Sequence, residues 1–379
     1  HKRIALKMLL LIGTDAKYLI GGFMLVSALI SMWIMNTSTT LMLLPIGLAI
    51  AGVVRSTTSL DKDFTNFQTA LLLGIAYAAT IGGMATPIGT GPNIVVISLI
   101  QEQGLKVSFY QWMLLATPIS AIMLLVGWWL LTHIIFPINI TGNENTKNSL
   151  QRMYLDLGKV TVDERRVLII FVFTAMAWMT RDFLDNFFLF SGLTDYGIAI
   201  IAALAVFITR SSTGSGLIEW NITSKLPWGI LILFGGGLSM ANAIMDSGLG
   251  KWIGGLIPDI HAVLLILLIV ALIVFLTELT SNQATTATFV PIMIILATAE
   301  SNLLPDGSNN LSLVAQLAIP VALASSCAFM LPVATPPNAI VYGSEKFGIT
   351  EMMRAGLYIN IVGIIVVTLF SAYVLPLIF

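Results

Sequence analysis

The chain has 379 residues, of which 57% are hydrophobic and only 10% charged, and its mean hydropathy is +0.94. A soluble domain carries roughly 25% charged residues, so the composition argues against a soluble domain and predicts an all-α membrane protein. The net charge of −1 and the lack of a basic patch give no sign of a nucleic-acid partner.

The predicted elements follow one another in chain order. They are an amphipathic interfacial helix (1–17), a first re-entrant hairpin (18–54), transmembrane helices with an unwound segment at 86–93 (64–138), a cytoplasmic connector (139–166), scaffold helices (167–225), a transmembrane helix plus an interfacial helix (226–257), a second re-entrant hairpin (258–300), and transmembrane helices with an unwound segment at 331–338 (313–379).

The two hairpins are predicted from apolar runs that polar residues interrupt. In the first, apolar residues 18–35 and 41–54 flank Asn36-Thr37-Ser38-Thr39-Thr40. A half-helix of about 15 residues rises only about 22 Å, which is short of the hydrocarbon core of about 30 Å. We therefore expect each hairpin to stop near the midplane, with a polar tip that lines a wet cavity.

The positive charges support this layout. Fifteen of the 18 lysines and arginines fall in loops that share one side, and only Lys106, Arg181 and Lys251 fall in the alternate loops. The positive-inside rule places the first group in the cytoplasm. This alternation of positively charged and other loops holds only if each hairpin enters and leaves the membrane on one side.

The two halves of the chain repeat one pattern. Pro45 follows Asn36 by nine residues, and Pro291 follows Asn282 by nine. Each tip is followed by a Pro-rich motif, which ends at Asn93 in the first half and at Asn338 in the second. The spacing is 57 residues from 36 to 93 and 56 from 282 to 338. Broken helices in corresponding halves of a membrane protein indicate a transporter's binding site, and the charge pattern indicates that the halves are inverted.

The second copy has a further helix upstream of its hairpin, from Pro227 to Ala243, and no counterpart precedes His1. We therefore expect one or more additional N-terminal transmembrane helices.

Four stretches should converge on the site: 31–40, 86–93, 277–288 and 331–338. They contain Asn, Thr, Ser and Gln, one acid (Glu278), and no Lys or Arg. Such a site can bind an anion only through amides, hydroxyls and helix N-termini. Backbone carbonyls freed at the unwound points suit Na⁺, so we expect a cation to bind beside the anion and offset its charge. Glu278 is either a proton-coupling carboxylate or a residue that orients the hairpin, and we favour the second role.

These motifs resemble the divalent anion/sodium symporters, a family that carries di- and tricarboxylates or sulfate. The resemblance runs from His1-Lys2-Arg3-Ile4 to the last helix. The family has Ser-Asn-Thr at each tip, where this chain has Met35-Asn36-Thr37 and Ser281-Asn282-Gln283. Gln283 is the more serious departure, because a longer amide projects into the substrate space.

The resemblance implies residue roles. The expected substrate-binding residues are Asn36, Thr37, Thr90, Asn282, Gln283, Thr335 and Pro336. Two Na⁺ sites are expected, one at Ser31, Met35, Asn36 and Gly89, and the other at Thr277, Thr280, Asn282 and Ala334.

The resemblance also implies a homodimer in the plasma (inner) membrane that works by an elevator mechanism. The expected function is Na⁺-coupled transport of small dicarboxylates such as succinate, malate or fumarate. The alternatives are a Na⁺-independent exchanger, tricarboxylate or sulfate transport, and a passive anion channel. An intramembrane enzyme is disfavoured, since no metalloprotease, G-x-S-x-G or Walker motif is present.

Overall fold

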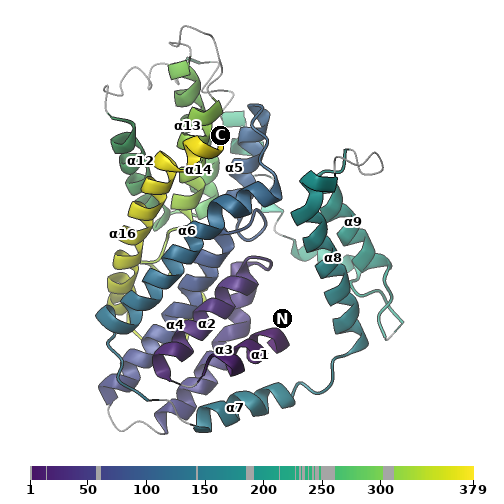
Figure 1. The fold of residues 1–379 in the computed structure, drawn as a ribbon, viewed down its shortest axis with the longest axis vertical. Helices are drawn as coiled ribbons and strands as arrows, with labels where there is room; N and C mark the ends of the chain where they lie inside the picture. Colours follow the sequence, from purple (N-terminus) through teal and green to yellow (C-terminus); the bar gives the residue numbers. More distant parts are fainter. Residues whose placement is uncertain are drawn as a thin grey trace.

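The computed structural model describes residues 2–13, 15–56, 61–141, 144–184, 192–212, 214–226, 261–301 and 311–379, with scattered residues between 228 and 248 (Figure 1). Within these residues the named elements are all helical. They are α1 (Lys2–Ile12), α2 (Ala16–Ser31), α3 (Asn36–Arg55), α4 (Asp61–Met84), α5 (Gly91–Glu102), α6 (Phe109–Trp129) with a π-helical extension (Leu130–Ile135), α7 (Glu144–Leu155), α8 (Val162–Leu184), α9 (Asp195–Ile208), a 3₁₀ turn (Trp220–Lys225), α12 (Ala262–Thr277), α13 (Asn282–Ser301), α14 (Leu311–Ser325), α15 (Pro336–Tyr342), α16 (Ile349–Tyr373) and α17 (Leu375–Ile378).

Four of the described helical segments are long and apolar enough to cross a membrane: α3, α4, α6 with its extension, and α16 with α17. Large apolar side chains on the outer helices remain exposed, among them Leu268 and Leu272 of α12 and Ile361 and Ile365 of α16. In water such surfaces would be unfavourable, whereas lipid solvates them at no cost. The class predicted from composition, a helical membrane protein, agrees with this arrangement.

The two halves share a set of corresponding helix contacts. In the first half α4 contacts α2, α3 and α6, and in the second half α14 contacts α12, α13 and α16. Figure 1 shows α2–α4 in the lower part of the molecule and α12–α14 in the upper part. Close approach to α4 depends on small residues, because a Cβ added at Gly82 would collide with the backbone of Ala28 in α2.

The halves also exchange one helix each. α5, from the first half, packs against α13 and α14, while α15, from the second half, packs against α3 and α4. Each exchanged helix begins directly after a break in the chain. The two breaks and the N-termini of α5 and α15 therefore lie between the halves.

The hairpins differ from the prediction in where the chain turns. The non-helical tips are residues 32–35 and 278–281, so Asn36–Thr40 and Asn282–Thr286 form the first turns of α3 and α13. The polar residues 36–40, predicted to form the tip of the first hairpin, are therefore helical. α3 has 20 residues and rises about 30 Å, so length alone does not prevent it from spanning.

The unwound segments also have different bounds from those predicted. The first break covers 85–90, and the second covers 326–335. Gly91–Asn93 and Pro336–Asn338, predicted to be unwound, are helical instead. Proline is compatible with the first helical turn, where its missing N–H would have no partner, and Pro92 and Pro336 occupy this position.

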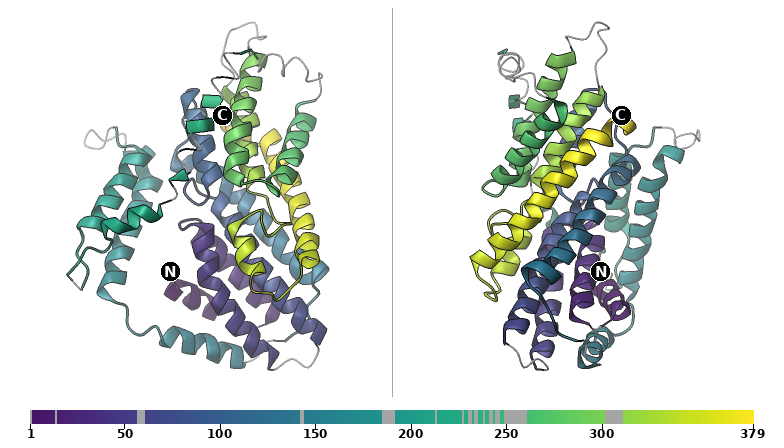
Figure 2. Two further views of the ribbon diagram at one scale, coloured as in Figure 1. Left: turned by 180° about the vertical axis from the view of Figure 1, so that it is seen from behind. Right: turned by 60° about the vertical axis from the view of Figure 1, so that its left-hand side comes forward.

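Helices α8 and α9 pair with each other and stand beside the main body, to which α7 connects them (Figures 1 and 2). Their ends are joined by Asp163, which accepts hydrogen bonds from the hydroxyls of Ser211 and Ser212 at 2.7 and 2.8 Å. These bonds hold the pKa of the Asp163 carboxyl below its ordinary value. The predicted helices at 226–257 lie largely outside the described residues.

Candidate functional site

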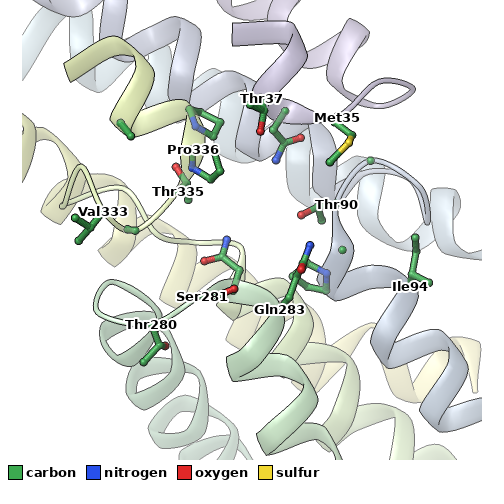
Figure 3. A pocket seen from close by; sticks show the side chains of 18 of the residues that line it. Met35, Thr37, Thr90, Ile94, Thr280, Ser281, Gln283, Val333, Thr335 and Pro336 are labelled. Carbon is green, nitrogen blue, oxygen red and sulfur yellow. The ribbon is translucent and has the colours of Figure 1, made fainter. Parts of the chain in front are cut away.

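A cavity of about 700 Å³ lies where the two hairpin tips and the two breaks meet (Figure 3). Each of the four predicted stretches contributes to its wall. The lining comprises Met35, Asn36, Thr37, Ile88, Gly89, Thr90, Gly91, Pro92, Ile94, Leu279, Thr280, Ser281, Asn282, Gln283, Pro332, Val333, Ala334, Thr335, Pro336, Pro337 and Ala339. No lysine or arginine is among these described lining residues.

Asn36 belongs to a cluster of oxygen atoms at the first tip. Its side-chain amide lies 2.6 Å from Ser31 Oγ, and the same amide atom lies 3.1 Å from the carbonyl oxygen of Gly89 and 3.2 Å from that of Ala79. If the amide nitrogen faces this cluster, it donates to all three oxygens. If the amide oxygen faces it, four oxygens converge, which is the arrangement that a bound cation would bridge.

The second tip repeats this cluster. Thr277 Oγ1 lies 2.8 Å from Asn282 Oδ1 and 2.9 Å from the carbonyl oxygen of Ser325. Thr277 corresponds to Ser31, and the Ser325 carbonyl joins the second cluster as the Ala79 carbonyl joins the first, although Thr277 rather than Asn282 contacts it. Ala334, the counterpart of Gly89, lines the adjoining cavity.

Two buried asparagines hold the breaks in place. The side-chain amide of Asn93 donates to the carbonyl oxygens of Met84 and Thr86 at 3.0 and 2.8 Å. Asn338 donates to those of Ala328 and Leu331 at 3.2 and 3.0 Å. Carbonyls that a broken helix leaves without partners need such donors. These two asparagines ended the repeated sequence motifs, and their role is to position the site rather than to line it.

Glu278 fixes the second tip to the second break. The carboxylate is 4% exposed and accepts hydrogen bonds from the backbone N–H groups of Phe329, Met330 and Leu331 at 2.7–2.9 Å. It also accepts one at 2.7 Å from the side-chain amide of Asn360 in α16. Four donors surround its oxygens, and Glu278 is not among the cavity-lining residues. This geometry favours the predicted orienting role.

Three long helices begin at the cavity: α3 at Asn36, α5 at Gly91 and α13 at Asn282. Neither α3 nor α5 has a side-chain cap at its N-terminus. The first N–H groups of α3 therefore keep their hydrogen-bonding capacity, whereas in α5 Pro92 has no N–H and the N–H of Asn93 donates to the Thr90 carbonyl. Helix N-termini carry partial positive charge and bind carboxylates and phosphates. The cavity can therefore attract an anion without a cationic side chain.

The two sides of the cavity are not equivalent. Gln283, at the start of α13, lies so close to Gly91 that a Cβ added at Gly91 would collide with its side-chain amide. At the corresponding place in the other half, the short Thr37 is the second residue of α3 and the larger Pro336 begins α15, and these two helices are in contact. On one side of the cavity the long Gln283 thus faces the small Gly91. On the other side the short Thr37 faces the larger Pro336.

The structure brings the predicted site residues together. All seven predicted substrate residues line the cavity, as do Met35, Gly89, Thr280 and Ala334. Ser31 and Thr277 lie behind it, bonded to the two tip asparagines. Sequence reasoning missed the carbonyl oxygens of Ala79 and Ser325, because a backbone atom leaves no signature in residue type.

The fold and this cavity define an all-helical membrane transporter. Residues 1–379 match the family described as sodium:sulfate symporter transmembrane region, and the chain belongs to this family, as the resemblance to divalent anion/sodium symporters predicted. The sodium-dependent dicarboxylate transporter SdcS of Staphylococcus saprophyticus is 35% identical over 99% of this chain and 73% of its own length. SdcS of Staphylococcus aureus is 36% identical over the whole chain and 73% of its own length.

Proposed function

We propose that this protein carries small dicarboxylates, of the succinate, malate or fumarate type, across the plasma membrane together with Na⁺. The observation that carries the proposal is the donor set of the cavity: helix N-termini and neutral hydroxyls and amides, with two oxygen clusters beside them. A divalent anion buried among neutral donors alone would be costly. A co-bound cation offsets that charge and thereby couples the two movements.

The residues present fit Na⁺. Each cluster combines an asparagine side-chain amide, a hydroxyl and at least one backbone carbonyl. With the Asn36 amide turned so that its oxygen faces the first cluster, both clusters offer the oxygen ligands that hard cations prefer. Asn36, Ser31 and Gly89 would hold one ion, with the carbonyl of Ala79 added to the predicted set. Asn282, Thr277 and Ala334 would hold the second, with the carbonyl of Ser325 added.

The corresponding helix contacts of the two halves support an inverted repeat with two re-entrant hairpins. The separate position of α8 and α9 supports an elevator mechanism, in which the hairpin-bearing body slides past a scaffold that includes these helices. We further propose a homodimer, as the family resemblance implies. The sodium-dependent dicarboxylate transport stated in the names of the two SdcS relatives supports the same assignment.

The test is uptake of radiolabelled succinate by proteoliposomes under an inward Na⁺ gradient, with K⁺ replacing Na⁺ as the control. We expect uphill accumulation that requires Na⁺. Counterflow that persists without Na⁺ would instead identify an exchanger, and dissipative flux alone would identify a channel. Competition by citrate and by sulfate in the same vesicles sets the substrate class, and either of them outcompeting succinate would contradict the dicarboxylate assignment.

A further inference from the structure

A cluster of four aromatic rings joins the first hairpin tip to α8. Trp33, in the tip, stacks on Phe109 at the start of α6, with ring centroids 6.0 Å apart and planes at 21°. Trp33 also meets Phe171 of α8 edge-on at 5.5 Å and 84°. Phe109 in turn stacks on Trp178 of α8 at 5.0 Å and 4°. All three pairs have the geometry that attracts aromatic rings.

The α8 side of this cluster is held by polar contacts. The indole N–H of Trp178 donates to the carbonyl oxygen of Asp195 at the start of α9, at 3.1 Å. Ser108, one residue before Phe109, donates its hydroxyl to the Asp182 carboxylate of α8 at 2.5 Å. Helices α6, α8 and α9 therefore present Trp33 with a defined surface.

Trp33 belongs to the same short turn as the first oxygen cluster. Its backbone N–H donates to the carbonyl of Ile30 at 3.0 Å, and the carbonyl of Met32 accepts the hydroxyl of Thr86 in the first break. Asn36 follows three residues later. Because the tip is only four residues long, a change in the position of Asn36 can be transmitted to the backbone that carries the Trp33 ring.

The second tip lacks this link. The residue three before Asn282 is Leu279, which is 75% exposed in the described part of the chain. The second tip is tied by Glu278 to residues 329–331 and to α16, all within its own half. One tip thus contacts α8, whereas the other contacts only the hairpin-bearing body among the contacts that the structure describes.

We propose that Trp33 is a positioning residue that links cation binding at the Asn36 cluster to the seating of the first hairpin on α8. A cation that orders Asn36 also orders the turn, and this favours the conformation in which the Trp33 ring packs on α8. Packing of the ring on α8 in turn favours the conformation of the tip that binds the cation. The coupling is reciprocal, as linkage requires. Among the described residues it applies to the first hairpin, whose tip contacts α8, and it rests on the proposed Na⁺-coupled function.

The test measures the Na⁺ concentration that gives half-maximal succinate uptake by the full chain in proteoliposomes. Trp33→Ala and Phe171→Ala should each raise it, by about two- to tenfold if one aromatic pair is lost. The double variant should raise this concentration no further than Trp33→Ala does, because Trp33→Ala already removes the Trp33–Phe171 contact. Phe173→Ala and Met176→Ala, at exposed positions of α8 outside the cavity lining, are the controls and should leave this concentration unchanged.

Trp33→Phe keeps a ring at the contact and should restore near-normal Na⁺ dependence. It should also remove the Na⁺-induced change in tryptophan fluorescence, a signal that a merely structural role would not produce.

Normal Na⁺ dependence in Trp33→Ala, multiplicative effects in the double variant, or equal shifts in the controls would each overturn the proposal. If Trp33→Ala does not fold, Phe171→Ala and Trp33→Phe read the same contact. Na⁺-independent uptake by the unmodified chain would overturn the proposed function as well, so the two failures are distinguishable.

Discussion

At the scale of residues, the site depends on two asparagines that do equivalent work in the two halves. Asn36 begins α3 and Asn282 begins α13, and each side chain joins a hydroxyl and a carbonyl in an oxygen cluster. Both also line the cavity. Each asparagine can therefore contact cation and anion together. We expect that neither asparagine compensates for the loss of the other.

Asn36→Ala and Asn282→Ala should each reduce succinate uptake about ten- to hundredfold, since a hydrogen bond to a charged group is worth roughly 1.5–3 kcal/mol. Ser38→Ala is the matched control, because Ser38 lies in the same first turn of α3 but is exposed and outside the cavity lining. Membrane insertion and elution as a single species would show that the variants fold. Near-normal uptake in either asparagine variant would refute the site.

The pairing of Gln283 with Gly91 makes a second prediction. Gly91→Ala should lower uptake, because the added Cβ collides with the Gln283 amide. Gln283→Thr, which shortens that side chain, should restore uptake in the double variant. The measurement is succinate uptake by the two single variants and the double variant. Equal loss in Gly91→Ala with and without Gln283→Thr would show that the two residues do not share this space.

At the scale of elements, the second hairpin is anchored to the second break and to α16 through one carboxylate. Glu278 accepts from three consecutive backbone N–H groups and from Asn360. The corresponding position in the first hairpin is Met32, whose backbone carbonyl accepts one hydroxyl instead. The second tip therefore depends on a side chain for an attachment that the first tip makes with its backbone.

Glu278→Ala should lower the thermal stability of the protein, because each buried donor left without an acceptor costs about 1–3 kcal/mol. Glu278→Gln should lower it less, since one oxygen remains. Stability is measured by heating the detergent-solubilised protein and quantifying the folded peak by size-exclusion chromatography. A proton-coupling role predicts something different, namely that Glu278→Gln removes the response of uptake to a pH gradient while stability stays normal.

At the scale of the whole molecule, the exchange of α5 and α15 makes the two halves one body, while α8 and α9 contact this body through few elements. A sliding mechanism requires the contacts between α6 and α8 to break in each cycle. The Ser108–Asp182 hydrogen bond is one such contact. It offers a place to stop the motion without altering the cavity.

Ser108→Cys combined with Asp182→Cys, in a chain where the single native Cys327 is replaced by Ala, should be joined by a short thiol-reactive crosslinker. Crosslinking should stop succinate uptake but preserve Na⁺-dependent succinate binding, and a reducible crosslinker should allow thiol treatment to restore uptake. Each single-cysteine variant treated in the same way is the control. Full uptake by the crosslinked protein would argue against sliding at this contact.

Several features were predictable because they depend on residue type and spacing. The Asn36 and Asn282 motifs, the Asn93 and Asn338 motifs and the lack of positive side chains at the site are all visible in the sequence. The ends of the helices were less predictable. Pro92 and Pro336 suggested unwound backbone, yet proline fits a first helical turn as well as a break, and composition does not distinguish the two.

The sequence by itself determined the membrane-protein class, the duplication, the family and most of the cavity-lining residues, because hydropathy, repeated motifs and side-chain chemistry are properties of the chain. Only the tertiary structure decided how the halves exchange α5 and α15, which carbonyls join the oxygen clusters, and where Glu278 and Trp33 attach the tips. These features depend on contacts between residues far apart in the chain and on backbone atoms that every residue carries, so residue type alone does not specify them.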